Sequence, residues 1–120
     1  MKNYMFEICA NSAESCVAAQ QGGAHRVELC AGMPEGGTTP SLGEIKVARK
    51  LIDIRLHVII RPRGGDFLYT PSELEIIGRR YSSCPSGGSR WGGVRLPYTG
   101  RRAGQAGHAA SDGSFQGDFR

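Results

Sequence analysis

Two cysteines, Cys9 and Cys30, each close a short apolar segment of the kind that forms a buried β-strand. If the two strands are neighbours in a parallel sheet, both thiols lie at the same edge and can approach each other. Soft thiolates suit Cu(I), which usually takes two or three sulfur ligands, so the pair is a candidate metal site. The competing interpretation is packing, because a buried cysteine often behaves as a small hydrophobic residue.

Charged residues lie in the same two segments. Glu7 and Glu28 are flanked by apolar residues, which predicts that both carboxylates point into the interior of the fold. A carboxylate in that position needs a partner, and the natural candidates are Arg26, Arg61 and Arg63. The set describes either a structural ion-pair network or a substrate site.

The segment RPRGG at residues 61–65 is the most pointed motif in the chain. Two guanidinium groups beside glycines, whose backbone N–H groups a ligand can reach, would suit a phosphate or a carboxylate. The residues predicted to bind such an anionic substrate are Glu7, Arg26, Glu28, Arg61, Arg63, Gly64 and Gly65. The alternative is a rigid loop whose arginines bind the internal carboxylates.

A repeating strand–helix pattern would position these residues. Strands are predicted at residues 4–9, 26–30 and 56–60, and helices at residues 12–21, 41–51 and 72–80. The expected helix caps are Asn11-Ser12, Ser41 and Thr70. His57 in the third strand is expected to be a core histidine with a hydrogen-bond partner. The order predicts an α/β fold with a parallel sheet, either doubly wound or closed into a barrel.

The composition changes after residue 81. Nine of the 18 glycines fall between positions 87 and 117, and the branched aliphatic residues of residues 82–120 are Val94 and Leu96 alone. Such a segment buries too little apolar area to offset the entropy of ordering. The chain is therefore predicted to consist of a folded part, residues 1–81, and a disordered Gly/Arg-rich tail, residues 82–120, without helix or strand.

The net charge of +4 is concentrated in that tail. Residues 1–81 hold ten Lys/Arg and nine Asp/Glu, whereas residues 82–120 hold five Arg and two Asp. A nucleic-acid-binding tail would combine these arginines with stacking aromatic side chains such as Trp91 and Tyr98. Nucleic acid is nevertheless not an expected partner, because Arg/Gly-rich sequence also arises when GC-rich DNA is translated out of frame.

Cellular location follows from what the sequence lacks. No apolar run approaches the roughly 18 residues of a membrane helix, so a membrane partner is not expected. The N-terminus has no signal-peptide pattern, which predicts the cytoplasm and four free thiols. There is no C-x-x-C pair, which argues against a structural zinc site.

Four segments together resemble the CutC family of copper homeostasis proteins. They are FEICANS at residues 6–12, GGAHRVELC at 22–30, EGGTTPS at 35–41 and VIIRPRGGDFLY at 58–69. The resemblance implies a TIM-type (β/α)8 barrel in the cytoplasm, of which this chain supplies the first three βα units. It also implies a role in copper handling with bound Cu(I), for which Cys30 is the best candidate ligand and Cys9 the second.

The resemblance stops near residue 80, where the family continues with further strands and helices. A shifted reading frame would explain the departure. The codons of residues 104–108, read one base later, can encode a segment similar to the family's sequence before its next helix. The tail is therefore predicted to be an out-of-frame product.

Three interpretations of function stay open. The chain is a truncated copper homeostasis protein that binds Cu(I), a TIM-barrel enzyme of unassigned reaction, or a fragment without function, since three strands of a barrel leave an open edge. The expected partner is accordingly a copper ion or a small anionic metabolite. The resemblance also allows a homo-oligomer like that of the family, although truncation of the barrel argues against it.

Overall fold

The computed structural model describes residues 4–84 and 91–95. The elements in order are β1 (Glu7–Ala10), α1 (Ala13–Gln21), β2 (Arg26–Leu29), the 3-10 turn η1 (Met33–Glu35), α2 (Leu42–Leu51), β3 (Arg55–Ile59), α3 (Pro71–Ser83) and β4 (Trp91–Arg95). The predicted alternation of three strands with three helices is confirmed, with α3 running to Ser83 instead of Arg80.

Each helix begins at a hydroxyl cap. The side chains of Ser12, Ser41 and Thr70 each accept a hydrogen bond from the backbone N–H three residues further on. At α3 the bond is reciprocal, because the Thr70 N–H donates to the Glu73 carboxylate at 2.8 Å and forms a capping box. Pro71 follows at the first helical position, where its missing N–H costs nothing. The three helices thus start where the sequence predicts.

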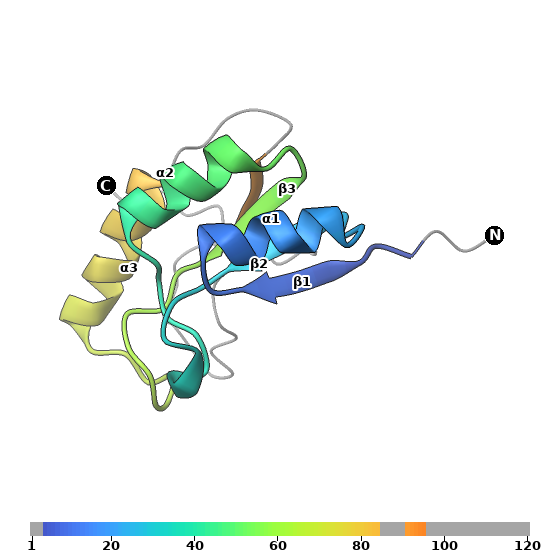
Figure 1. The fold of residues 1–120 in the computed structure, drawn as a ribbon. Coiled ribbons are helices and arrows are strands. Elements are labelled where there is room, and N and C mark those ends of the chain that lie inside the picture. The colour runs from blue at the N-terminus through green and yellow to red at the C-terminus, as the bar shows by residue number, and fades with distance from the viewer. Residues whose placement is uncertain (1–3, 85–90, 96–120) are drawn as a thin grey trace.

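The strands form one parallel sheet in the order β1-β2-β3-β4. Figure 1 shows α1 and α2 on the same side of this sheet. The core lies between the sheet and these helices. Its largest fully buried side chains are Val27, Leu29, Leu56 and Val58 of the sheet, Ile60 just after β3, Cys16 of α1 and Ile52 after α2. Helices that cover one face of a parallel sheet are the arrangement of an incomplete β/α barrel and not of a doubly wound fold.

Strand alternation places the chemically active residues on the other face. Across the sheet, Glu7 pairs with Arg26, and Cys9 pairs with Glu28, which pairs with His57. All five alternate with the core residues, so they point away from the helices. In a closed barrel this face is the interior.

Residues 91–95 correct one expectation. The sequence predicts no strand after residue 81, yet β4 pairs in parallel with β3. Strand pairing uses backbone groups, so Gly92 and Gly93 do not prevent it, and β3 would otherwise leave a row of N–H and C=O groups unpaired. The rest of the predicted tail, at residues 85–90 and 96–120, lies outside the described residues.

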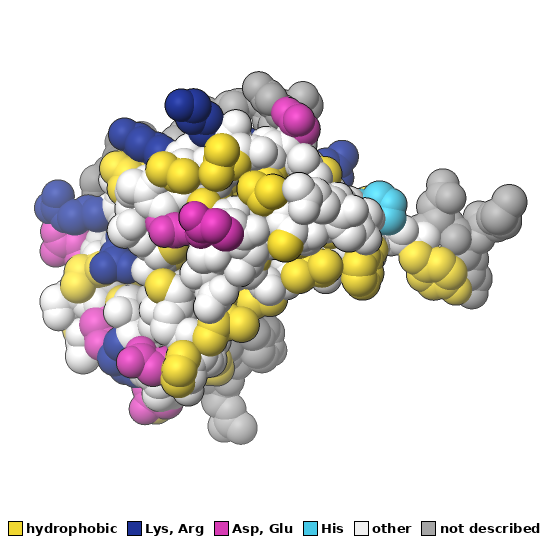
Figure 2. Space-filling view, in the orientation of Figure 1, with side chains coloured by type: hydrophobic (Ala, Val, Ile, Leu, Met, Phe, Trp, Pro, Cys, Tyr) yellow, Lys and Arg dark blue, Asp and Glu magenta, His cyan; other side chains and the backbone are white. Residues whose placement is uncertain are grey.

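The helical surface carries mixed chemistry. Figure 2 shows acidic and basic side chains interspersed with hydrophobic ones on the face formed by α1 and α2. The exposed apolar residues of α2 are Leu42, Val47 and Leu51, because its inward face is formed by Ile45 and Ala48. Within residues 4–84 and 91–95, no helix is long and apolar enough to cross a membrane.

Candidate metal centre

Cys9 and Cys30 meet at the carboxyl edge of β1 and β2. Cys9 lies in β1, and Cys30 follows β2 directly. The two Sγ atoms are 3.4 Å apart, which confirms the prediction that the thiols approach each other. The Cys30 N–H continues the ladder by donating to the Ala10 carbonyl at 2.9 Å, so the backbone fixes this juxtaposition.

The two thiols differ in their environment. Cys9 is exposed, whereas only 1% of Cys30 is accessible to solvent. Burial holds the pKa of the Cys30 thiol well above its usual range, and the hydrogen bond with Cys9 raises this pKa further. Cys30 is therefore protonated at neutral pH, and a bound cation has to displace that proton.

A third sulfur atom lies beside the pair. The Cys30 thiol donates to Met33 Sδ at 3.2 Å, and Met33 is the first residue of η1. Met33 was not among the ligands predicted from the sequence. The signal that could have revealed it is the C-x-x-M spacing of Cys30 and Met33, which puts a thioether one turn from a candidate thiolate.

The loop after β2 turns back on itself to bring Met33 to Cys30. Gly32 and Gly36 flank η1 with φ of 56° and 83°, backbone conformations that favour glycine. Beyond them the N–H of Ala31 donates to the Thr38 carbonyl at 2.9 Å, and that of Thr38 donates back at 2.7 Å. The closed loop thereby holds η1 over the end of β2.

Arg61, in the loop after β3, fixes this loop. Its Nη1 donates to the carbonyls of Glu35 at 2.9 Å and Gly37 at 3.1 Å, and its Nη2 donates to the Gly65 carbonyl at 2.8 Å. The guanidinium also lies 4.9 Å from the centroid of the Phe67 ring, and only 5% of the residue is exposed. Arg61 therefore binds backbone carbonyls, where the sequence suggested an anion or the internal carboxylates.

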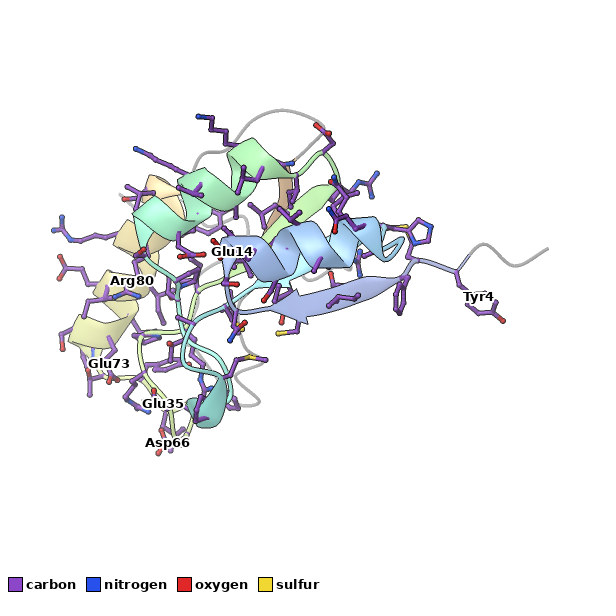
Figure 3. The ribbon with its side chains drawn as sticks, in the orientation of Figure 1. Tyr4, Glu14, Glu35, Asp66, Glu73 and Arg80 are labelled. Carbon is purple, nitrogen blue, oxygen red and sulfur yellow. The ribbon has the colours of Figure 1, made fainter. Side chains whose placement is uncertain are left out.

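Arg63 organises the following loop and the start of α3. Its Nε donates to Glu73 Oε1 at 2.6 Å, and its Nη2 donates to Asp66 Oδ1 at 3.1 Å and to the Leu68 carbonyl at 2.8 Å. The guanidinium holds the pKa of the Glu73 carboxyl below its usual value. Figure 3 places Glu35, Asp66 and Glu73 at the same end of the molecule. Arg63 thus binds groups of its own loop and of α3, where the sequence suggested an anion or the internal carboxylates.

The glycines of the motif have packing roles. A Cβ on Gly64 would lie 3.0 Å from Glu35 Cβ, so the glycine lets the loop after β3 lie against η1. Gly65 has a φ of 82° and presents its carbonyl to Arg61. Neither role tests the predicted anion site, which stays a prediction.

Glu7, Arg26 and His57 form a cluster on the same face of the sheet as Cys9. Arg26 Nε lies 2.5 Å from Glu7 Oε2, and His57 Nδ1 lies 3.0 Å from the same oxygen. The predicted pairing of Glu7 with Arg26 is confirmed, and His57 has the expected hydrogen-bond partner. Glu7 and Arg26 open their strands, whereas residues 61–65 follow the end of β3, so the seven predicted anion-binding residues do not form one cluster.

Comparison with known proteins decides the family. Residues 4–86 match the model of the CutC family, more than half of the chain. The chain belongs to the CutC family. A CutC family protein of Bacteroides fragilis is 72% identical over 78 residues, and the human copper homeostasis protein cutC homolog is 51% identical over 74 residues.

The structural comparison agrees. The crystal structure of a CutC protein from Streptococcus agalactiae matches 68% of this CutC chain with a TM-score of 0.62 and 35% sequence identity. The match covers 40% of that protein, and the sequence matches cover 31% of the Bacteroides fragilis protein and 27% of the human one. The chain thus spans about a third of the length of its curated CutC relatives and forms the first part of a β/α barrel.

Proposed function

We propose that this CutC chain acts in copper homeostasis by binding Cu(I) in the cytoplasm through Cys9 and Cys30. The observation that carries the proposal is the 3.4 Å separation of the two Sγ atoms at the carboxyl edge of adjacent parallel strands. The name of the human relative, a copper homeostasis protein, supports the same role.

The donor set fits a soft monovalent ion. A metal ion lies roughly 2.3 Å from a thiolate sulfur, so two sulfurs that share an ion can be at most about 4.6 Å apart. The Cys9 and Cys30 sulfurs satisfy that limit without any movement of the strands. Exposed Cys9 gives access from solvent, and buried Cys30 shields one side of the ion. The free thiols of Cys9, Cys16, Cys30 and Cys84 support a reducing compartment.

Binding exchanges protons for the ion. Each thiol that ligates Cu(I) releases its proton to solvent, so uptake is accompanied by proton release. In this proposal copper is the ion that the protein carries, held by Cys9 in β1 and by Cys30 directly after β2. An enzyme acting on an anionic substrate has less support, since Arg61 and Arg63 already donate to loop carbonyls and carboxylates.

A Cu(I) titration tests the proposal. Reduced chain is titrated under anaerobic conditions against a chromophoric Cu(I) chelator, with Cys9→Ser and Cys30→Ser as test variants. The matched control is Cys84→Ser, a buried cysteine at the end of α3 outside the site. We expect one tightly bound ion in wild type and control and a large loss in both test variants. Equal binding by Cys30→Ser and wild type would remove the proposed site.

We also propose that the residues after the family match arise from a shifted reading frame. The family match ends at residue 86 although the chain continues to residue 120. Resequencing of the gene across the codons of residues 77–83 is the direct test. A restored frame there should encode the next elements of the barrel, and an intact frame would refute the proposal.

A further inference from the structure

Met33 Sδ is the third sulfur at the candidate metal centre. Cys30 Sγ lies 3.4 Å from Cys9 Sγ and 3.2 Å from Met33 Sδ, so it contacts two other sulfurs. We propose that Met33 is the third ligand of the bound ion and makes the site selective for Cu(I) over Zn(II). This inference rests on the proposed Cu(I) site at Cys9 and Cys30.

The geometry permits a shared ion. The distances from Cys30 Sγ to Cys9 Sγ and to Met33 Sδ are both shorter than the limit of about 4.6 Å for two sulfurs on one ion. Met33 is an unbranched side chain with several rotatable bonds, so its sulfur can adjust to the ion at little cost. The backbone that carries it is fixed, because η1 is held between Gly32 and Gly36 and its loop is bound by Arg61.

The chemistry of the three donors selects the ion. A thioether is neutral and soft, which suits Cu(I), whereas Zn(II) prefers four ligands drawn from thiolate, imidazole and carboxylate groups. Within residues 4–84 and 91–95, no group of three or more His, Cys, Asp or Glu side chains could hold a metal ion. Two thiolates and a thioether therefore complete a site for Cu(I) but leave Zn(II) short of ligands.

Exposure indicates how the ion enters and leaves. Met33 is 46% exposed and Cys9 is exposed, whereas Cys30 is buried. The two accessible residues offer a route from solvent, and the buried cysteine anchors the ion next to the sheet. Because a thioether carries no proton at neutral pH, Met33 can bind and release the ion without proton transfer. Met33 is thus the ligand that exchanges first when the ion passes to another sulfur donor.

Methyl NMR on the full chain tests the assignment. The chain has three methionines, Met1, Met5 and Met33, so a sample labelled with 13C at the methionine methyls gives few signals, and Met33→Leu assigns the relevant one. One equivalent of Cu(I) is added to reduced protein, and Zn(II) is added to a second sample. We expect Cu(I) to shift the Met33 methyl and saturate at one equivalent, while Zn(II) leaves it in place.

Affinity provides the second measurement. Met33→Leu keeps the size of an exposed apolar side chain, and Met5→Leu is the matched control ahead of β1. By chelator competition, we expect Met33→Leu to weaken Cu(I) binding on the order of tenfold. Its Zn(II) affinity, and the Cu(I) affinity of Met5→Leu, should be unchanged.

The outcomes separate the two proposals. If the chain binds Cu(I) through its cysteines but the Met33 methyl does not move and Met33→Leu binds as tightly as wild type, the inference fails and the copper function stands. A Met33 shift with Zn(II) would refute the selectivity. If wild type binds no Cu(I), the proposed function fails and the inference with it.

Discussion

Arg61 Nη1 donates to the backbone carbonyl of Glu35 at 2.9 Å and so ties the loop after β3 to the loop after β2. The same nitrogen binds the Gly37 carbonyl, so the buried guanidinium holds both sides of the turn that follows Met33. Arg61 is therefore a positioning residue for the sulfur cluster. Arg61 itself lies after β3, but it fixes the position of Met33 relative to Cys30 in the loop after β2.

Replacing Arg61 by lysine should loosen that loop. An ammonium group cannot donate to three carbonyls in the fixed planes that the guanidinium provides. We expect Arg61→Lys to lower the free energy of unfolding by about 2–3 kcal/mol, since buried carbonyls lose their donors. Cu(I) affinity should fall to the level of Met33→Leu, and the double variant should lose no more affinity than either single one. Urea unfolding and chelator competition measure the two effects.

Arg79→Lys is the control for this substitution. Arg79 pairs with Glu75 on the exposed face of α3, where an ion pair contributes at most about 0.5 kcal/mol. Its stability and copper affinity should match wild type. If Arg61→Lys binds Cu(I) as wild type does, Arg61 does not position Met33.

The four thiols should react with alkylating reagents at different rates. Cys9 is exposed, whereas burial raises the pKa of Cys16 to about 11 and also raises that of Cys84. Because the thiolate is the nucleophile, we expect Cys9 to be alkylated first, and the buried thiols of Cys16 and Cys84 to react slowly. Mass spectrometry of native and urea-treated samples follows each site. Rapid labelling of Cys16 in native protein would contradict the described core.

Cu(I) should protect Cys9 from the same reagent. An ion shared with Cys30 occupies the sulfur lone pair that attacks the reagent. We expect the labelling rate of Cys9 to fall on addition of one equivalent of Cu(I), with the rate of Cys84 unchanged. Labelling of Cys9 at an equal rate with and without the ion would exclude it as a ligand.

The carboxylate of Glu7 should matter for stability and not for copper. It pairs with Arg26 and with His57 on the face of the sheet that also carries Cys9, but its oxygen atoms are hard donors that suit Cu(I) poorly. We expect Glu7→Gln to lower the free energy of unfolding by about 1–2 kcal/mol, because two partly buried groups lose a charged partner. Glu75→Gln breaks an exposed pair and is the matched control. A change in Cu(I) stoichiometry for Glu7→Gln would connect the cluster to the site.

The stability that Glu73 contributes at the start of α3 should depend on pH. Hydrogen bonds from Arg63, and then from the Thr70 N–H, hold the pKa of Glu73 below its ordinary value of 4.5. A carboxyl with a lowered folded pKa stabilises the fold above the unfolded value, and this contribution is lost as the pH falls through the folded pKa. We expect the difference in Tm between wild type and Glu73→Gln to be largest near pH 6 and to shrink below about pH 4.5. A constant difference down to about pH 3 would contradict this linkage.

Local signals explain why the strands and helices were predictable. The hydroxyl residues Ser12, Ser41 and Thr70 predict the starts of the helices. The apolar runs around Val27 and Val58 predict strands that are buried under helices. The approach of Cys9 to Cys30 followed from the same order, because neighbouring parallel strands end at one edge. These features depend on residues close together in the sequence or on the general rules of parallel sheets.

The partners of Arg61 and the role of Met33 could not be predicted in the same way. Arg61 binds backbone carbonyls of a loop more than 20 residues away, and a carbonyl group has no signature in the sequence. Met33 depends on that loop, since its sulfur reaches Cys30 only when Gly32 and Gly36 turn the chain back. Residues 91–95 were predicted to lack structure from their side chains, whereas the pairing of β4 uses the backbone.

The position of β1 at the edge of the described sheet has a mechanical consequence. In the described sheet β1 forms hydrogen bonds with β2 and with no other strand. An ion shared by Cys9 and Cys30 would therefore cross-link the edge strand to the end of its neighbour. Amide hydrogens of β2 that face β1 exchange with solvent when β1 separates from the sheet. The metal cross-link should slow that exchange. Bound copper would then lower the frequency with which β1 separates from β2.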